Sequence, residues 1–508
     1  MHWSALSVFI ALFVFVTGLG FAAARWRSGD LTLLHEWGLG GRRFGTFVTW
    51  FLLGGDLYTA YTFIAVPALV YGAGAMGFFA IPYTVIIYPL LYLVFPRLWS
   101  LAHQHGYVTS ADVVLGRYGN KWLALAVAVT GLVATMPYIA LQLVGMQVVI
   151  GAMGVPSDGM MGDLPLIIAF VILAAFTYTS GLRAPAMIAV VKDVLIYVVV
   201  IAVAVWVPIK LGGFGAVFAA VPAAKLTLAI PAGDTYGSYS TYATLAMGSA
   251  LALFLYPHSM TAILSSSSPG AIQRNAALLP AYSLVLGFLA LLGFMAVALH
   301  VGSDPAFAGG FKNYGANLAV PALILTVFPD WFAGVAFAAI AIGALVPSAI
   351  MSIACANIVS RNLYRGFIRP HATNAQESKV AKIASLVLKL GALVFIILVP
   401  VPYALQFQLL GGLWMIQVLP AVILGLYLRM LNGWALLAGW AVGALLGTWM
   451  ASTTAFKAAV FTVSFMGTSY PGYIALYALA ANVVVSIVLS LLLKPFVAQA
   501  AGHATGAD

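Results

Sequence analysis

The chain has 508 residues, of which 63% are hydrophobic and only 7% are charged, with a formal net charge of +10. A soluble domain carries about 25% charged residues, so this composition excludes a soluble protein and indicates an integral membrane protein. The positive charge is typical of basic cytoplasmic loops and needs no nucleic acid partner. The single cysteine, Cys355, excludes an internal disulfide and offers no metal cluster.

The apolar segments are continuous and about 20 residues long, which predicts membrane-spanning helices rather than the alternating strands of about 10 residues in a β-barrel. We therefore expect a single all-α transmembrane domain with about thirteen helices. In chain order they are 4–24, 46–71, 76–96, 122–153, 164–180, 185–208, 242–263, 278–301, 331–357, 380–400, 403–428, 433–452 and 473–493.

Basic residues predict the orientation of these helices. Most Lys and Arg residues lie in the loops after odd-numbered spans and in the C-terminal tail, whereas the opposite side has only Lys210, Lys225, Lys312 and Lys457. Cytoplasmic loops carry the excess of basic residues in membrane proteins. We therefore expect the N-terminus outside, the C-terminus in the cytoplasm and an odd number of spans.

The second span, "FLLGGDLYTAYTFIAVPALVYGAG" at 51–74, contains an acid, Asp56, directly after Gly54 and Gly55. Each glycine weakens a helix by about 1 kcal/mol relative to alanine. A helix broken inside the membrane frees backbone groups, which are tolerated where they line a cavity and bind ions or polar solutes. The alternative is an acid paired with a neighbouring helix, with the glycines allowing close packing.

The sixth span contains an intramembrane pair, Lys192 and Asp193. Lys192 lies nine residues after Arg183, which corresponds to a depth of roughly 13 Å at about 1.5 Å per residue. Ionisable residues at such depth are costly and are candidates for function. The alternative is a lysine whose stem extends back to the membrane surface.

Other polar positions in the spans are weaker candidates. His258 follows Pro257 in the seventh span, and Gln417 lies in the eleventh. Each is a candidate for the substrate pocket, with hydrogen bonding between helices as the alternative. We find no nucleotide loop, metal-ligand cluster or nucleophile–base motif, so we expect a protein that is not an enzyme and has no cofactor.

Four segments resemble the solute:sodium symporter family, and within it the bacterial monocarboxylate permeases for pyruvate, lactate and acetate. They are the region 33–74 around the broken second span, "GYVTSADVVLGRYG" at 106–119, "TYTSGLRAPAMIAVVKDVL" at 177–195 and "ALVPSAIMSIACANIVSRNLY" at 344–364. The resemblance covers nearly the whole chain.

The resemblance implies the leucine-transporter-type inverted-repeat fold. Residues 46–208 would form a first repeat of five helices and 242–428 the inverted second repeat, with extra helices at 4–24 and 433–493. It also implies a cation-coupled symporter that imports small monocarboxylates, with alanine as a further candidate, across a bacterial inner membrane by alternating access. A membrane-embedded sensor without net transport is the alternative. The oligomeric state is not predicted.

The family's site residues carry over to the broken second span. The carbonyls of Gly54 and Leu57 match positions that hold sodium, and Asp56 matches an acid near that ion. The side chains that would contact the substrate are Tyr58, Thr59, Tyr61, His258 and Gln417.

The chain departs from the family pattern in the ninth span. Val346 and Pro347 stand where the family supplies two hydroxyls to sodium, and Ser348 is one residue away. Hydrocarbon cannot replace oxygen ligands of a hard cation. Lys192 stands beside Asp193, which matches an acid near the sodium site, so an ammonium group would replace the sodium ion. Proton coupling is therefore slightly favoured over sodium coupling, with Ser348 as an oxygen donor in the sodium alternative.

Overall fold

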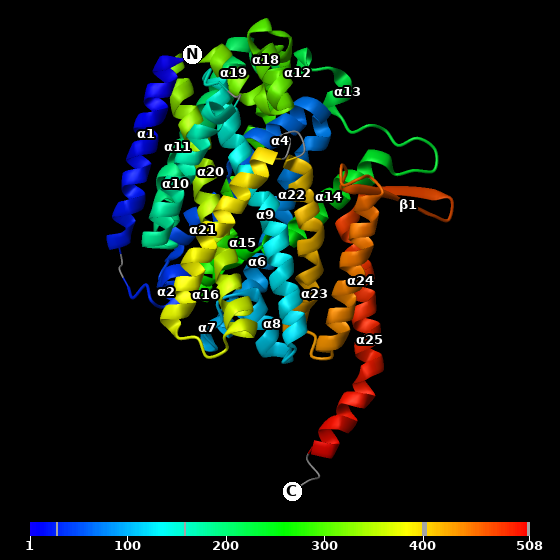
Figure 1. Ribbon diagram of the computed structural model, residues 1–508. Coiled ribbons are helices and arrows are strands. Elements are labelled where there is room, and N and C mark those ends of the chain that lie inside the picture. The colour runs from blue at the N-terminus through cyan, green and yellow to red at the C-terminus, as the bar shows by residue number, and fades with distance from the viewer. Residues whose placement is uncertain (27–28, 157–158, 399–403, 505–508) are drawn as a thin grey trace.

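The computed structural model describes residues 1–26, 29–156, 159–398 and 404–504. They form a helical bundle elongated along one axis, in which α1 begins at the top and α25 ends at the bottom (Figure 1). The helices of the first half are α1 (Trp3–Ala22), α2 (Leu34–Leu39), α3 (Thr46–Leu57), α4 (Ala60–Ala73), α5 (Ala80–Ile86), α6 (Tyr88–Leu93), α7 (Phe95–Gln104), α8 (Ser110–Tyr118), α9 (Lys121–Ala152), α10 (Gly159–Ser180), α11 (Arg183–Leu211), α12 (Phe214–Ala220) and α13 (Ala223–Leu226).

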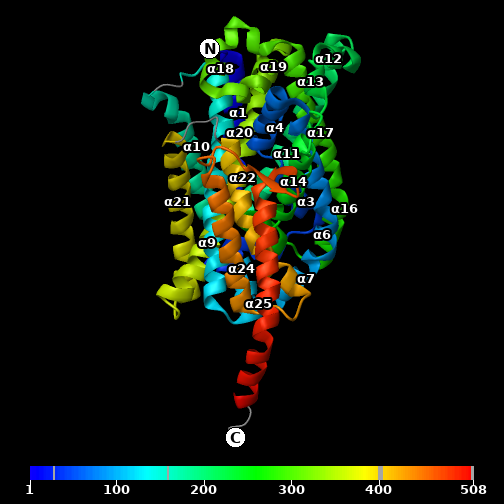
Figure 2. The ribbon, with the colours of Figure 1, turned by 90° about the vertical axis from the view of Figure 1, so that its right-hand side faces the viewer.

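The second half is also helical, apart from one hairpin. Its helices are α14 (Gly237–Leu253), α15 (Pro257–Leu264), α16 (Pro269–Leu278), α17 (Pro280–Ala298), α18 (Ala308–Tyr314), α19 (Ala319–Val327), α20 (Asp330–Ile358), α21 (Asn374–Leu398), α22 (Ala404–Met415), α23 (Leu419–Val422), α24 (Gly433–Ser452) and α25 (Ile474–Ala504). A π-helical segment, Val359–Ile368, continues α20. Strands β1 (Val460–Phe465) and β2 (Thr468–Tyr473) pair antiparallel between α24 and α25, which pack together on one face of the bundle (Figure 2).

The helical membrane-protein class predicted from the sequence is confirmed. In the described residues nine helical segments are long and apolar enough to cross a membrane, and the bent pair α14–α15 makes a tenth. One of the nine, Thr46–Leu93, covers the second predicted span and most of the third. The total of thirteen and the division into two five-helix repeats therefore stay predictions.

Two helices are interrupted inside the bundle. Tyr58 and Thr59 have non-helical backbone angles and separate α3 from α4, as the glycines at the end of α3 predicted. The axes of α14 and α15 differ by 48°, and Tyr256 is non-helical just before Pro257. Proline is favoured at the first position of a helix because it has no N–H to leave unpaired. Each interruption leaves backbone polar groups in the interior.

Helix α20 is the core element against which these broken helices pack. It is almost entirely buried, between α1, α9, α11 and α21, and it also touches α3, α4 and α15. Small residues make such contact possible: a Cβ on Gly334 would lie 2.4 Å from the carbonyl oxygen of Ala5 in α1. Close approach through small residues is the usual packing mode of membrane helices, because lipid offers no hydrophobic gain for their association.

The segment before α3 is held at the bottom of the bundle by a buried anchor. Trp37 in α2 is fully buried, and its indole N–H donates to the carbonyl of Thr177 over 3.2 Å. Glu36 forms ion pairs with Arg183, which is 1% exposed, and with Arg43, which is 51% exposed. Glu36 therefore links α2 to the start of α11 through one buried and one exposed arginine.

These two arginines should differ sharply in their effect on stability. Arg183→Ala leaves the buried Glu36 carboxylate without its enclosed partner and should lower the free energy of unfolding by about 3 kcal/mol. Arg43→Ala removes an exposed pair and should cost at most about 1 kcal/mol. Denaturant unfolding of the two purified variants measures the difference, and equal losses would show that burial does not decide the strength of these pairs.

Candidate functional site

The break between α3 and α4 builds the centre of the site from backbone groups. Thr59 is the N-cap of α4, and its N–H donates to the Thr62 hydroxyl over 3.0 Å. That hydroxyl donates in turn to the carbonyl of Leu57 over 2.6 Å. Because a threonine three residues into α4 supplies both bonds, the chain can leave one helix and begin the next without losing these backbone partners.

Lys192 of α11 places its ammonium group at this break. Its Nζ donates to the carbonyls of Gly55 and Tyr58 over 2.7 and 2.8 Å, and it lies 2.8 Å from Oδ1 of Asp193. Lys192 and Asp193 are fully buried. An ammonium group has three N–H donors and no acceptor; here two carbonyls accept hydrogen bonds from it, and the Asp193 carboxylate forms an ion pair with it. A monovalent cation that belongs to the protein therefore occupies the end of the broken helix.

Asp193 has a second partner that connects the pair to α17. The Tyr282 hydroxyl donates to Oδ2 of Asp193 over 2.7 Å. The Tyr282 ring lies against Gly54, where a Cβ would be 2.2 Å from the ring, and against the rings of Trp50 and Tyr58 at 4.6 and 4.8 Å. The glycine therefore allows the tyrosine to reach the carboxylate.

The carbonyls of Gly55 and Tyr58, which accept hydrogen bonds from Lys192, each lie one residue after a carbonyl that was expected to hold the ion, namely those of Gly54 and Leu57. The carbonyl of Gly54 accepts the Tyr58 N–H at 2.9 Å, and that of Leu57 accepts the Thr62 hydroxyl. The Ser348 hydroxyl donates to the carbonyl of Ala344 in its own helix over 2.8 Å. A family alignment could not give this register, because the helix end is set by the Thr59–Thr62 cap.

Asp56 meets the second broken helix. Its Oδ2 accepts a hydrogen bond from the Ser259 hydroxyl over 2.8 Å and lies 3.6 Å from Nε2 of His258, both in the first turn of α15. All three side chains are buried. Within the described residues, neither Oδ1 of Asp56 nor Nδ1 of His258 has a hydrogen-bond partner. The breaks of α3–α4 and α14–α15 thus share a carboxylate, an imidazole and a hydroxyl with unused hydrogen-bonding capacity.

Aromatic rings enclose this cluster. The rings of Tyr138 in α9 and of Tyr256 each lie 5.3 Å from the His258 ring. A cavity of about 20 Å³ borders both tyrosines and reaches Tyr83 and Tyr473. Such a volume holds about one water molecule, so the site is closely packed in this structure.

The remaining predicted substrate contacts fall into two groups. Thr59 is buried at the break, and Tyr58 is buried with a hydroxyl that has no partner within the described residues. Gln417 instead exchanges hydrogen bonds with its own helical segment and with Asn482 of α25, at 3.1 Å each, which is the interhelical alternative. The side chain of Tyr61 lies outside the described residues.

Sequence reasoning missed Ser259 and Tyr282, which are uncharged and lie more than eighty residues from their acidic partners. A serine directly after His258 was the available signal for the first, and there was none for the second. In the part of the chain that the structure describes, no group of three or more His, Cys, Asp or Glu side chains converges to hold a metal ion.

Two broken helices that meet around buried charges define a class of protein, the secondary transporter. The fold matches a solved structure of a Na+-coupled sialic acid symporter in its substrate-bound outward-open state. The TM-score is 0.78, with 14% identity over 96% of this chain and 98% of that one. The leucine-transporter-type fold expected from the sequence is thereby confirmed.

The chain belongs to the sodium:solute symporter family, whose profile matches residues 37–443. It is 52% identical over 498 residues to a monocarboxylate transport permease protein of Rhizobium johnstonii, covering 97% of this chain and 98% of the relative. It is 32% identical over 490 residues to the uncharacterized symporter YodF of Bacillus subtilis, covering 96% and 93%. It is thus a multi-pass membrane protein of a cation-coupled symporter family.

The two glycines before Asp56 should respond differently to a methyl group. Gly54→Ala places a Cβ 2.2 Å from the rigid Tyr282 ring and should destabilise the protein by about 1–3 kcal/mol. Gly55→Ala places its Cβ 2.8 Å from Nζ of Lys192, at the end of a flexible side chain that can move. The higher helix propensity of alanine, about 1 kcal/mol, should offset much of that strain. Denaturant unfolding of both variants tests this order, and a larger loss for Gly55→Ala would contradict it.

Proposed function

We propose that the chain imports small monocarboxylates such as pyruvate, lactate and acetate, with alanine as a further candidate, together with protons. It would work by alternating access in a bacterial inner membrane, with the N-terminus outside and the C-terminus in the cytoplasm. The printed name of the Rhizobium relative supports the substrate class. The single observation that carries the choice of ion is the position of Lys192 at the break of α3.

Lys192 places its ammonium group beside the two carbonyls, of Gly54 and Leu57, that would be expected to hold sodium. Its ammonium uses the carbonyls of Gly55 and Tyr58 and one oxygen of Asp193. Sodium, like other hard cations, is bound by several oxygen ligands, and Val346 and Pro347 of α20 bring no side-chain oxygen. A proton on Lys192 would therefore supply the positive charge at this position.

Gain and loss of this proton would change how α11 holds the first broken helix. Hydrogen bonds from a charged donor are worth about 1.5–3 kcal/mol each, so the two bonds to carbonyls hold the break firmly while Lys192 is charged. An uncharged amine loses most of this attraction and its ion pair with Asp193. The proton would thus decide whether α11 and the α3–α4 break stay together during the transport cycle.

The substrate would bind where the two breaks meet. The positive end of the α4 dipole favours a carboxylate. Nδ1 of His258 has no partner within the described residues and would be a further donor in the tautomer that carries its proton on Nδ1. Lys192 and Asp193 neutralise each other, so an ionised Asp56 would leave an unbalanced negative charge beside the substrate anion. A proton on Asp56 removes this repulsion, which again favours transport with protons.

Uptake by the reconstituted protein tests the function. Labelled pyruvate should accumulate in proteoliposomes under an imposed inward proton gradient without sodium, and unlabelled lactate and acetate should compete for it. Proline and glucose should not compete. Lys192→Met should abolish proton-driven accumulation, because a thioether fills the space without carrying a proton. The matched control is Lys389→Met, which removes an equally buried lysine that bonds to Ser385 in α21, away from the α3 break.

The sodium alternative gives the opposite result in the same vesicles. Accumulation driven by an inward sodium gradient at equal pH on both sides, and lost when choline replaces sodium, would overturn proton coupling. Competition by proline or glucose in place of lactate would overturn the substrate class.

Asp56 variants should separate binding from accumulation. Asp56→Asn keeps a hydrogen-bonding group beside Ser259 and mimics the protonated acid, so the variant should still bind pyruvate. Its accumulation of pyruvate should fall at least about tenfold, which corresponds to a loss of about 1.4 kcal/mol of coupling free energy. Asp56→Ala should lose both binding and uptake while still inserting in the membrane. Tryptophan fluorescence titration measures binding, and Ser259→Ala is the control that removes one hydrogen bond and no charge. Accumulation by Asp56→Asn at the wild-type level would exclude a role for its proton.

A further inference from the structure

A second polar region lies at the end of the bundle where α7 and α8 are found (Figure 1). A cavity of about 450 Å³ is lined there by His35, Arg42, His103, Arg361, Arg365 and Glu377, among others. A neighbouring cavity of about 360 Å³ shares Arg361 and Arg365 and adds Asp112 and Lys121. Volumes of this size are typical of small-molecule sites.

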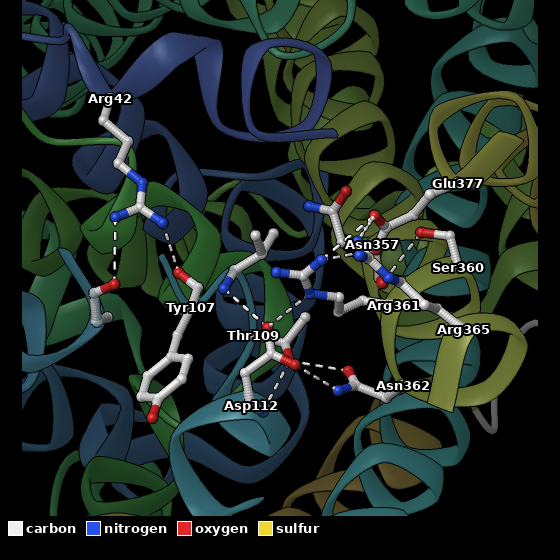
Figure 3. Close-up of polar contacts among 12 residues, drawn as sticks. Arg42, Tyr107, Thr109, Asp112, Asn357, Ser360, Arg361, Asn362, Arg365 and Glu377 are labelled. Carbon is white, nitrogen blue, oxygen red and sulfur yellow. Dashed lines mark hydrogen bonds and ion pairs between the residues drawn. The ribbon is translucent and has the colours of Figure 1, made fainter. Parts of the chain in front are cut away.

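The two carboxylates of this region are already engaged. Glu377 accepts hydrogen bonds from Arg361 at 3.1 and 3.2 Å and from Arg365 at 2.7 Å. Asp112 accepts from the side chain of Asn362 at 2.7 Å and from the N–H of Val108 at 2.9 Å. Nε of Arg361 also contacts Oδ2 of Asp112, at 3.4 Å (Figure 3). Neither acid therefore has capacity to spare for another cation.

Arg42 is a cation of this region that forms no ion pair with either acid. Its guanidinium donates to the carbonyls of Ala102 and Tyr107 over 3.3 and 2.6 Å, and among the described residues it forms no ion pair (Figure 3). Burial, followed by the charge of Arg361, lowers the pKa of Arg42, and Asp112 opposes this only in part. Arg42 thus faces another arginine across the cavity.

The backbone at Arg42 is held in an unfavourable conformation. Gly40, Gly41 and Arg42 have φ angles of 58°, 70° and 56°, in the left-handed region. Glycine adopts this region freely, whereas an arginine there is strained and is found where the surrounding structure enforces it. A Cβ on Gly40 would lie 2.5 Å from the Phe44 ring, so the turn is tightly packed and fixes the direction of the Arg42 side chain.

The region carries excess positive charge. The two cavities together are lined by the cations Arg42, Lys121, Arg361 and Arg365 and by the anions Asp112 and Glu377, a net formal charge of +2. Burial lowers the pKa of His35, which Glu36 offsets only in part, so this histidine is uncharged near pH 7. A phosphate group carries a charge of about −1.5 to −2 at that pH and matches this excess.

We propose that this cavity binds a phosphate group, with Arg42 as its main ligand and Arg361 and Arg365 on the opposite side. The planar fork of arginine suits the bidentate recognition of phosphate oxygens. The group comes either from a soluble phosphate-bearing anion or from the headgroup of an anionic lipid. A bound phosphate would connect the turn before α3 to the π-helical segment after α20.

Calorimetric titration of inorganic phosphate into the full-length protein tests the site. The protein is held in nanodiscs of zwitterionic lipid at pH 7. Arg42→Gln should raise the Kd for phosphate about tenfold or more, because it removes a charge-assisted bidentate contact. The matched control is Arg97→Gln, which removes an arginine of α7 that lines neither cavity and lies 4.8 Å from the Tyr427 ring. Its Kd should stay within about twofold of the wild type.

A second variant and a second lipid composition complete the test. Arg42→Lys keeps the charge without the fork, so an intermediate Kd should follow even if Arg42→Gln does not fold. In nanodiscs containing phosphatidylglycerol, loss of the Arg42-dependent binding of inorganic phosphate assigns the site to the lipid headgroup, and its retention assigns it to a soluble anion. The proposal is overturned if the Kd is the same in the wild type, Arg42→Gln and Arg42→Lys, or if phosphate does not bind in zwitterionic lipid.

Discussion

The interaction on which the central structure depends is the contact between the Lys192 ammonium and the carbonyl end of α3. A buried charge and an interrupted helix are each costly in a membrane, because neither finds water. Here each satisfies the other: the ammonium donates to Gly55 and Tyr58, and these carbonyls have no helical partner beyond the break. Gly55 has no side chain in the path of this approach, and an added methyl group would lie 2.8 Å from Nζ, so the end of the lysine side chain would have to shift.

From this contact the other polar links follow in sequence. Asp193 balances the charge of Lys192 and receives the Tyr282 hydroxyl, which brings α17 to the same point as α11 and α3. On the other side of the break, Asp56 reaches Ser259 and His258 at the start of α15. The two acids differ in charge balance, because Asp193 is paired with the Lys192 ammonium and Asp56 has no such cation beside it. Asp56, which has no lysine or arginine partner among the described residues, thus lies between the two helix breaks.

The sequence predicted the break in the second span better than the contacts that are made there. Gly54, Gly55 and Asp56 marked the break correctly, and the lysine in the sixth span indicated a cation that belongs to the protein. The Lys192 ammonium bonds to the carbonyls of Gly55 and Tyr58, next to Gly54 and Leu57, whose role as ion ligands stays a prediction. Gln417 illustrates the other difficulty. An amide in an apolar helix must find a partner, but its sequence does not say whether that partner is a substrate or Asn482 of α25.

The sequence by itself determined the class of this protein. Its composition requires a membrane, and the spacing of its apolar segments requires helices. The few intramembrane charges are the predicted functional positions, since such residues are kept only against a cost. The tertiary structure decided which groups neutralise those charges. Lys192 and Gly55 lie 137 residues apart, and Asp56 and Ser259 lie 203 apart. Burial dictates that each charge must have a partner, but only the packing of distant helices brings a particular oxygen or hydroxyl within hydrogen-bonding distance.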